Sequence, residues 1–173
     1  MGAPARIRII GLGNTFGGDD AVGVLAARRL GGLVAGRAEV VEAEMAGLEL
    51  LELMEGADMV ILIDAARTGQ PAGTIHRLDA STTPVAAPLF AHSTHALNAV
   101  EALELARALG RLPDRVLVYG IEVEELSAGR SLSQAVGAAL EQVVRRVVAD
   151  IEAKTRCMNA LCLNKSSRWW RRW

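Results

Sequence analysis

Carboxylate and imidazole side chains stand at three places where the sequence predicts the end of a strand or the start of a helix. Asp19 and Asp20 follow a Gly-Leu-Gly-Asn turn. Asp64 closes a run of apolar residues, and His95 stands at the start of a helical pattern. In open α/β sheets, ligands bind at the carboxyl ends of the strands. Together, Asp20, Asp64 and His95 would leave coordination positions open, which suits a divalent transition metal bound through oxygen and imidazole.

Each member of this set also has a structural explanation. Acidic residues in the first turn of a helix stabilise it by about 0.3 to 1 kcal/mol, so Asp19 and Asp20 could both be capping residues. One acid suffices for that role, which leaves the second for a site. Asp64 could cap the turn after its strand, although a buried carboxylate without a partner is costly. His95 alone could be a capping or packing residue.

A role in the site is less expected for four other acidic and histidine residues. His92 lies before the presumed helix, and His76 lies in an alternating strand where a surface position is expected. Glu44 and Glu122 are acids near other strand ends, and we expect both to be solvated. A dinucleotide fingerprint is disfavoured because Phe16 takes the place of its third glycine, and the acids that follow would repel a pyrophosphate.

The residue types present narrow the chemistry further. Both cysteines, both lysines and all three tryptophans lie in residues 154–173. Residues 1–153 therefore cannot use a cysteine nucleophile, a Schiff-base lysine or a cysteine-ligated metal. The sequence contains neither a Gly-x-Ser-x-Gly elbow nor a His-Glu-x-x-His zinc helix. Carboxylates, histidines, hydroxyls or a metal must carry any reaction.

Short apolar and β-branched runs alternate with helical patterns along the chain, and these elements must position the site. The alternation predicts a single-domain α/β three-layer sandwich, with a twisted, mostly parallel five-stranded sheet flanked by helices. The predicted strands are 6–10, 39–42, 59–64, 74–78, at a sheet edge, and 115–121. The predicted helices are 19–30, 47–55, 93–109, capped by Ser93, and 133–151, capped by Ser131 or Ser133.

Charge is divided unevenly between the body of the chain and its end. Six of the 19 basic residues and none of the 20 acidic residues lie in 154–173, so residues 1–153 carry a net charge of −7. We expect 1–153 to form one domain and 154–173 to be a basic tail, disordered or non-native, because its composition is foreign to the body. The acidic body disfavours nucleic-acid binding. Because the chain shows no membrane span and no signal peptide, we expect a cytoplasmic protein.

Several short motifs follow one another in order between Ile7 and Val148. They are Gly11-Leu12-Gly13-Asn14, Asp19-Asp20-Ala21-Val22-Gly23, Ala46-Gly47-Leu48-Glu49-Leu50-Leu51, Ile63-Asp64-Ala65, Ser93-Thr94-His95, Gly120-Ile121-Glu122, Gly129 and Leu132-Ser133. Together they resemble the hydrogenase maturation proteases. These endopeptidases remove the C-terminal extension of the nickel–iron hydrogenase large subunit. The tail lies outside the resemblance.

The resemblance implies a function and a role for each site residue. It implies a phosphorylase/hydrolase-like fold and an endopeptidase grouped with the aspartic type. Family members use two acids and a histidine to recognise nickel already placed in the precursor, and they cut only after that metal is loaded. By motif these residues are Asp20, Asp64 and His95, which serve as metal ligands and catalytic residues. Nickel is then bound by the substrate and is not a cofactor of the enzyme. The enzyme is expected to be a monomer whose partner is the large-subunit precursor.

Some residues depart from the family pattern. The segment Glu42-Ala43-Glu44-Met45 stands where many members have an Asp-Gly-Gly-Thr-like stretch, which indicates a different partner contact. Asp20 replaces the glutamate of some members, and its shorter side chain can still bind a metal. Sequence leaves open whether nickel polarises the scissile carbonyl or a carboxylate activates water.

Two other functions compete with proteolysis. One is a non-cleaving, nickel-dependent escort of the hydrogenase precursor, since sequence predicts ligands rather than turnover. The other is a peptidyl-tRNA hydrolase-like enzyme, which shares the Gly-Leu-Gly-Asn strand exit. Those enzymes continue with Asn-Pro-Gly and a histidine shortly after, whereas this chain has no histidine before His76.

Overall fold

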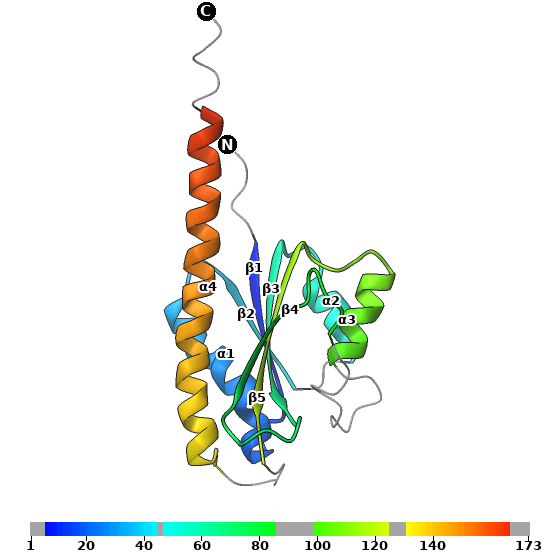
Figure 1. The fold of residues 1–173 in the computed structure, drawn as a ribbon, viewed down its shortest axis with the longest axis vertical. Helices are drawn as coiled ribbons and strands as arrows, with labels where there is room; N and C mark the ends of the chain where they lie inside the picture. The colour runs from blue at the N-terminus through cyan, green and yellow to red at the C-terminus, as the bar shows by residue number, and fades with distance from the viewer. Residues whose placement is uncertain (1–5, 45–46, 86–98, 125–130, 167–173) are drawn as a thin grey trace, which may run out of the picture.

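A computed structural model gives the fold of the chain (Figure 1), and it describes residues 6–44, 47–85, 99–124 and 131–166. The elements in chain order are β1 (Ile7–Leu12), the 3₁₀ helix η1 (Gly18–Ala21), α1 (Val22–Leu33), β2 (Glu39–Ala43), α2 (Glu49–Met54), β3 (Met59–Ala66), β4 (Ile75–Asp79), α3 (Ala99–Ala108), β5 (Arg115–Glu122) and α4 (Gln134–Ser166).

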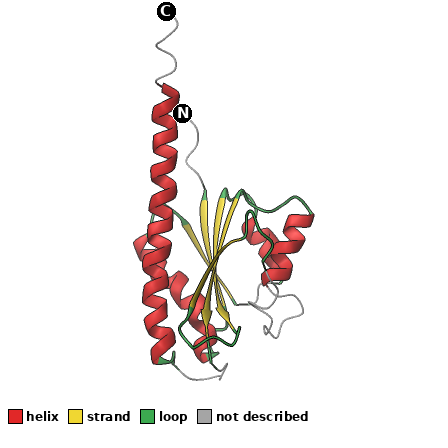
Figure 2. Cartoon of the chain, viewed as in Figure 1, coloured by secondary structure: helices red, strands yellow, loops and turns green. Residues whose placement is uncertain are grey.

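The strands form one five-stranded sheet in the order β2-β1-β3-β5-β4. The pairs β1–β2, β1–β3 and β3–β5 are parallel, and β4 is antiparallel to β5 at one edge. Figure 2 shows α1 and α4 on one face of the sheet and α2 and α3 on the other. The predicted three-layer α/β fold with a mostly parallel sheet is therefore confirmed, including the position of the fourth strand at an edge.

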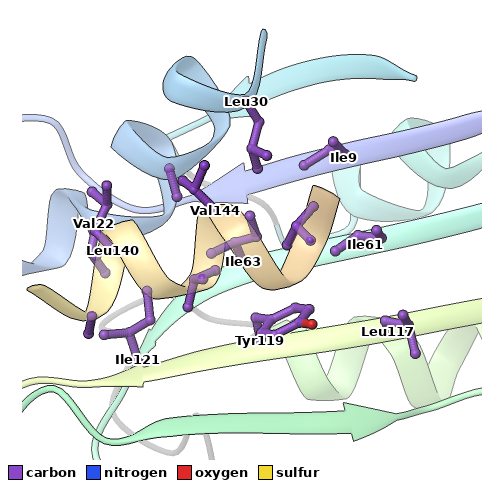
Figure 3. Close-up of a cluster of buried hydrophobic side chains, with 14 of the residues drawn as sticks. Ile9, Val22, Leu30, Ile61, Ile63, Leu117, Tyr119, Ile121, Leu140 and Val144 are labelled. Atoms are coloured by element: carbon purple, nitrogen blue, oxygen red, sulfur yellow. The ribbon is translucent and has the colours of Figure 1, made fainter. Parts of the chain in front are cut away.

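Alternating side chains of the central strands supply two separate hydrophobic clusters. On the face covered by α1 and α4, Ile61 and Ile63 of β3 pack with Tyr119 of β5 (Figure 3). On the opposite face, Leu62 of β3 packs with Val118 of β5 and with residues of α2 and α3. Because successive side chains of a strand point to opposite faces, Asp64 lies on the face of Leu62, toward α2 and α3.

Some element boundaries differ from the sequence prediction. The described part of the third helix begins at Ala99, so the predicted cap Ser93 and the two histidines near it, His92 and His95, lie outside the described residues. The last helix does not end at Ile151 but continues to Ser166, so it includes residues 154–166 of the predicted tail. That the tail is a unit separate from the domain stays a prediction. Within the described residues, no helix is both long and apolar enough to cross a membrane.

Two glycines allow α1 to lie directly on the ends of β1 and β3. A Cβ atom at Gly23 would lie 2.2 Å from the carbonyl oxygen of Leu12 and 2.3 Å from that of Ile63. A Cβ at Gly11 would lie 2.2 Å from the carbonyl oxygen of Gly23. Since no side chain fits between these backbones, the start of α1 is held close to the strand that carries Asp64.

We expect Gly23→Ala to destabilise the protein by about 3 kcal/mol or more, because the added methyl group must displace backbone atoms. Gly31 is the matched control, since it lies in the same helix and a Cβ there meets nothing within 4 Å. Gly31→Ala should stabilise the helix by up to about 1 kcal/mol. Urea denaturation of both variants measures the difference, and equal effects of the two substitutions would contradict this packing argument.

Candidate active site at the carboxyl edge of the sheet

Two of the three predicted site residues meet at the carboxyl edge of the sheet. Asp20 lies in η1, immediately before α1, and Asp64 lies near the end of β3. Both side chains are partly exposed. They are close enough for the charge of Asp20 to raise the pKa of Asp64. The structure thus brings together the two predicted carboxylates, from segments joined through the Gly23 contact.

Asp19, the neighbour of Asp20, has a different role. Its side chain is buried, and its Oδ1 accepts a hydrogen bond from the backbone N–H of Ser133, at 2.6 Å. Ser133 in turn accepts a hydrogen bond from Val136 N–H, at 3.4 Å, at the start of α4. Neither η1 nor α1 has a side-chain N-cap. Both acids lie in the first turn of η1, but neither caps its own helix through a side-chain hydrogen bond, and Asp19 instead holds the start of α4.

Asp64 is the most electrostatically perturbed carboxyl group at this edge. Its pKa is raised to about 7, chiefly because the carboxyl group is shielded from water. The hydrogen bond from Ala65 N–H lowers the pKa in part, and the charge of Asp20 contributes to the rise. The Ala65 N–H lies 2.8 Å from Asp64 Oδ1. The strand continues to Ala66, so Asp64 does not cap a turn as its structural explanation required. A divalent cation between Asp20 and Asp64 would offset both the burial and the repulsion of the two carboxylates.

The third predicted ligand, His95, lies outside the described residues. Accordingly, the described part of the chain contains no group of three or more His, Cys, Asp or Glu side chains that could hold a metal ion. The role of His95 in the site stays a prediction.

Glu122, which we expected to be solvated, is instead almost fully buried, with 1% of its surface exposed. Its Oε1 accepts backbone N–H groups of Thr68, Gly69 and Gln70, at 2.6, 2.8 and 3.1 Å. Its Oε2 accepts the Thr68 hydroxyl at 3.0 Å and pairs with His76 Nε2 at 3.0 Å. Burial alone would raise the pKa of Glu122, but the hydrogen bonds from His76 and Thr68 outweigh it and lower the pKa.

The expectation that His76 is a surface residue is also wrong. Its side chain is only 19% exposed, and Glu122 holds its Nε2. Sequence reasoning missed both residues, although a signal was present. Glu122 follows Val116 and Val118 at intervals of two along its strand, which places it on a buried face. By contrast, Glu44 is exposed as expected, and it accepts a hydrogen bond from the Thr15 hydroxyl at 2.7 Å.

We expect Glu122→Gln to destabilise the protein by about 2 to 3 kcal/mol, because the amide cannot accept all of the N–H and O–H groups that meet the carboxylate. Since the pKa of Glu122 is lowered in the folded state, its contribution is present above the ordinary glutamate pKa. It is lost as the pH falls through the folded value. Urea denaturation at pH 7 and at pH 3 tests both points, and a cost that is the same at the two pH values would refute the charge argument.

The fold and the site define an α/β domain whose carboxylates meet at the strand ends, where proteins of this architecture bind ligands. A family model described as hydrogenase maturation protease matches residues 27–150. The hydrogenase 2 maturation protease of Escherichia coli (strain K12) is 30% identical over 149 residues, which cover 83% of this chain and 89% of that protein. The chain therefore belongs to the hydrogenase maturation protease family.

Other similarities agree with this assignment. The solved structure of the hydrogenase maturating endopeptidase HybD from E. coli matches with a TM-score of 0.73 at 27% identity, over 86% of this chain and 93% of that one. The HycI hydrogenase maturation protease from Thermococcus kodakarensis matches with a TM-score of 0.63 at 25% identity, over 85% and 92%. HupD from Thiocapsa roseopersicina, a hydrogenase expression/formation protein, is 27% identical over 73% of this chain, which spans only 58% of HupD.

Proposed function

We propose that this protein is an endopeptidase that removes the C-terminal extension of a nickel–iron hydrogenase large-subunit precursor after nickel has been inserted. The observation that carries the proposal is the meeting of Asp20 and Asp64 at the carboxyl edge of the sheet, in a chain of the hydrogenase maturation protease family. Nickel arrives with the substrate, and we assign Asp20, Asp64 and His95 as the residues that recognise it. The proposal places the enzyme in the cytoplasm as a monomer.

The carboxylate pair is suited to this role for two reasons. Oxygen and imidazole ligands bind divalent transition metals, and the two carboxylates repel one another until a cation joins them. A carboxyl group whose pKa is raised to about 7 can also exchange a proton near neutral pH. The pair therefore supports two reactions, in which nickel polarises the scissile carbonyl or a carboxylate activates the attacking water. Only the second of these reactions, in which a carboxylate activates water, corresponds to the aspartic-type grouping that the resemblance implies.

The test uses the purified full chain and a candidate precursor, with and without nickel, analysed by gel shift. We expect the precursor to become shorter only when it carries nickel. Nickel-dependent binding without shortening would refute cleavage and indicate the escort function instead. The peptidyl-tRNA hydrolase alternative gains no support from the family assignment, and release of the peptide from a peptidyl-tRNA would be the result in its favour.

A further inference from the structure

His76 of β4 lies in register with Asp64 of β3, and one residue of β5 lies between them; we call these three positions a row of the sheet. In the register of the strands, Asp64 pairs with Gly120, and Gly120 pairs with His76. The three residues share one face, because Leu62 and Val118 before them, and Leu78 beyond His76, all pack in the cluster on the side of α2 and α3. Strand spacing puts the Cα atoms of Asp64 and His76 roughly 10 Å apart. Between them, Gly120 is buried and carries no side chain, so no side chain of β5 separates Asp64 from His76 along this row.

The contact with Glu122 determines which nitrogen of the His76 ring donates a hydrogen bond and which can accept one. An ionised carboxylate can only accept hydrogen bonds, so Nε2 of His76 must donate to Glu122. In the neutral ring, Nδ1 is then an acceptor, and within the described residues it has no hydrogen-bond partner. A carboxylate that holds one ring nitrogen and leaves the other available is the arrangement by which proteins orient a functional histidine.

Space for a ligand adjoins this pair. A pocket of about 330 Å³ opens beside Glu122, and it is lined by the loop after β3 and the end of β5. Its lining residues are Arg67, Gly69, Gln70, Glu122, Val123 and Glu124. The loop keeps its shape because Glu122 accepts three of its backbone N–H groups. A peptide that enters this pocket would therefore lie beside the Glu122 carboxylate that holds His76.

We propose that His76 is a substrate-binding residue, whose Nδ1 accepts a hydrogen bond from the peptide backbone of the precursor's C-terminal segment. This inference rests on the proposed proteolytic function and extends the site from Asp64 to β4. Glu122 is a positioning residue, because it holds the ring and the adjoining loop and contacts the substrate only through them.

Two substitutions at His76 separate binding from a purely structural role. In His76→Gln the amide nitrogen can replace Nε2 as donor to Glu122, whereas in His76→Asn the amide oxygen can replace Nδ1 as acceptor. For the nickel-loaded precursor, we expect His76→Gln to raise KM about tenfold with kcat changed less than about twofold, and His76→Asn to lie closer to the wild type. Thr82→Ala is the control, because Thr82 is exposed beyond the other end of β4.

The outcomes distinguish this inference from the proposed function. A wild-type KM in His76→Gln together with a raised KM in His76→Asn would show a structural role through Glu122 and overturn the inference. A fall in kcat at unchanged KM, or no change in either variant, would also overturn it. Failure of the wild-type protein to shorten the nickel-loaded precursor would instead contradict the proposed function, on which the inference rests. Thermal unfolding of each variant ensures that the kinetics compare folded proteins.

Discussion

Asp64→Asn is expected to reduce cleavage of the nickel-loaded precursor by more than about a hundredfold. On the proposed function, the amide removes a charge that would face the nickel of the precursor and a group that would take a proton from water. Loss of a partner that merely supports a metal ligand typically costs 10- to 100-fold, so loss of the ligand itself should cost more. Gel analysis of precursor processing under single-turnover conditions measures the effect, because it excludes product release.

A matched control for this prediction lies next to the other end of β3. Asp58 lies immediately before β3, at the opposite end from Asp64, and its Oδ2 accepts a hydrogen bond from Arg6 N–H at 2.7 Å. Asp58→Asn keeps an acceptor for that hydrogen bond, so we expect near wild-type processing. Asp20→Asn should behave like Asp64→Asn if the two carboxylates bind one ion. Normal processing by both the Asp20 and the Asp64 variants would exclude these residues from the site.

The second large effect is a pH-dependent gain in stability in the same Asp64→Asn variant. The pKa of Asp64 is raised to about 7 in the folded protein, from an ordinary value of 3.8. The folded state therefore holds the proton more tightly than the unfolded chain. The stability from this proton is fully present below pH 3.8 and is lost as the pH rises through 7. At 1.36 kcal/mol per pKa unit, the whole effect is at most about 4 kcal/mol, with about 3 kcal/mol of it between pH 5 and pH 8.

Urea denaturation of the wild type and Asp64→Asn at pH 5 and at pH 8, without metal, tests this linkage. We expect the free energy of unfolding of the variant to exceed that of the wild type by more at pH 8 than at pH 5. The comparison at each pH cancels the titration of other groups, and Glu122 titrates below this range because its pKa is lowered. If the two proteins changed in parallel from pH 5 to pH 8, the raised pKa of Asp64 would be refuted.

The sequence was informative wherever a property depends on neighbours along the chain. The apolar run before Asp64 predicted a buried strand, and the Gly-Leu-Gly-Asn turn predicted the passage from β1 toward a helix. The end of the last helix was missed, because the apolar pattern that predicts the helix ends at Ile151 whereas the helix itself continues to Ser166. Figure 1 shows this part of α4 extending past the edge of the sheet that lies opposite the site.

The sequence by itself determined the α/β architecture and the placement of Asp20 and Asp64 at strand ends, since periodicity and chain order are local properties. Only the tertiary structure decided which carboxylates have structural partners and which lie together at the carboxyl edge of the sheet. Asp19 accepts a hydrogen bond from Ser133, which lies 114 residues away along the chain. Glu122 accepts hydrogen bonds from a loop that lies 52 to 54 residues before it. Burial and charge proximity arise from such distant segments. They distinguish Glu122, whose carboxylate is paired and whose pKa is lowered, from Asp64, whose pKa is raised and which we propose to be catalytic.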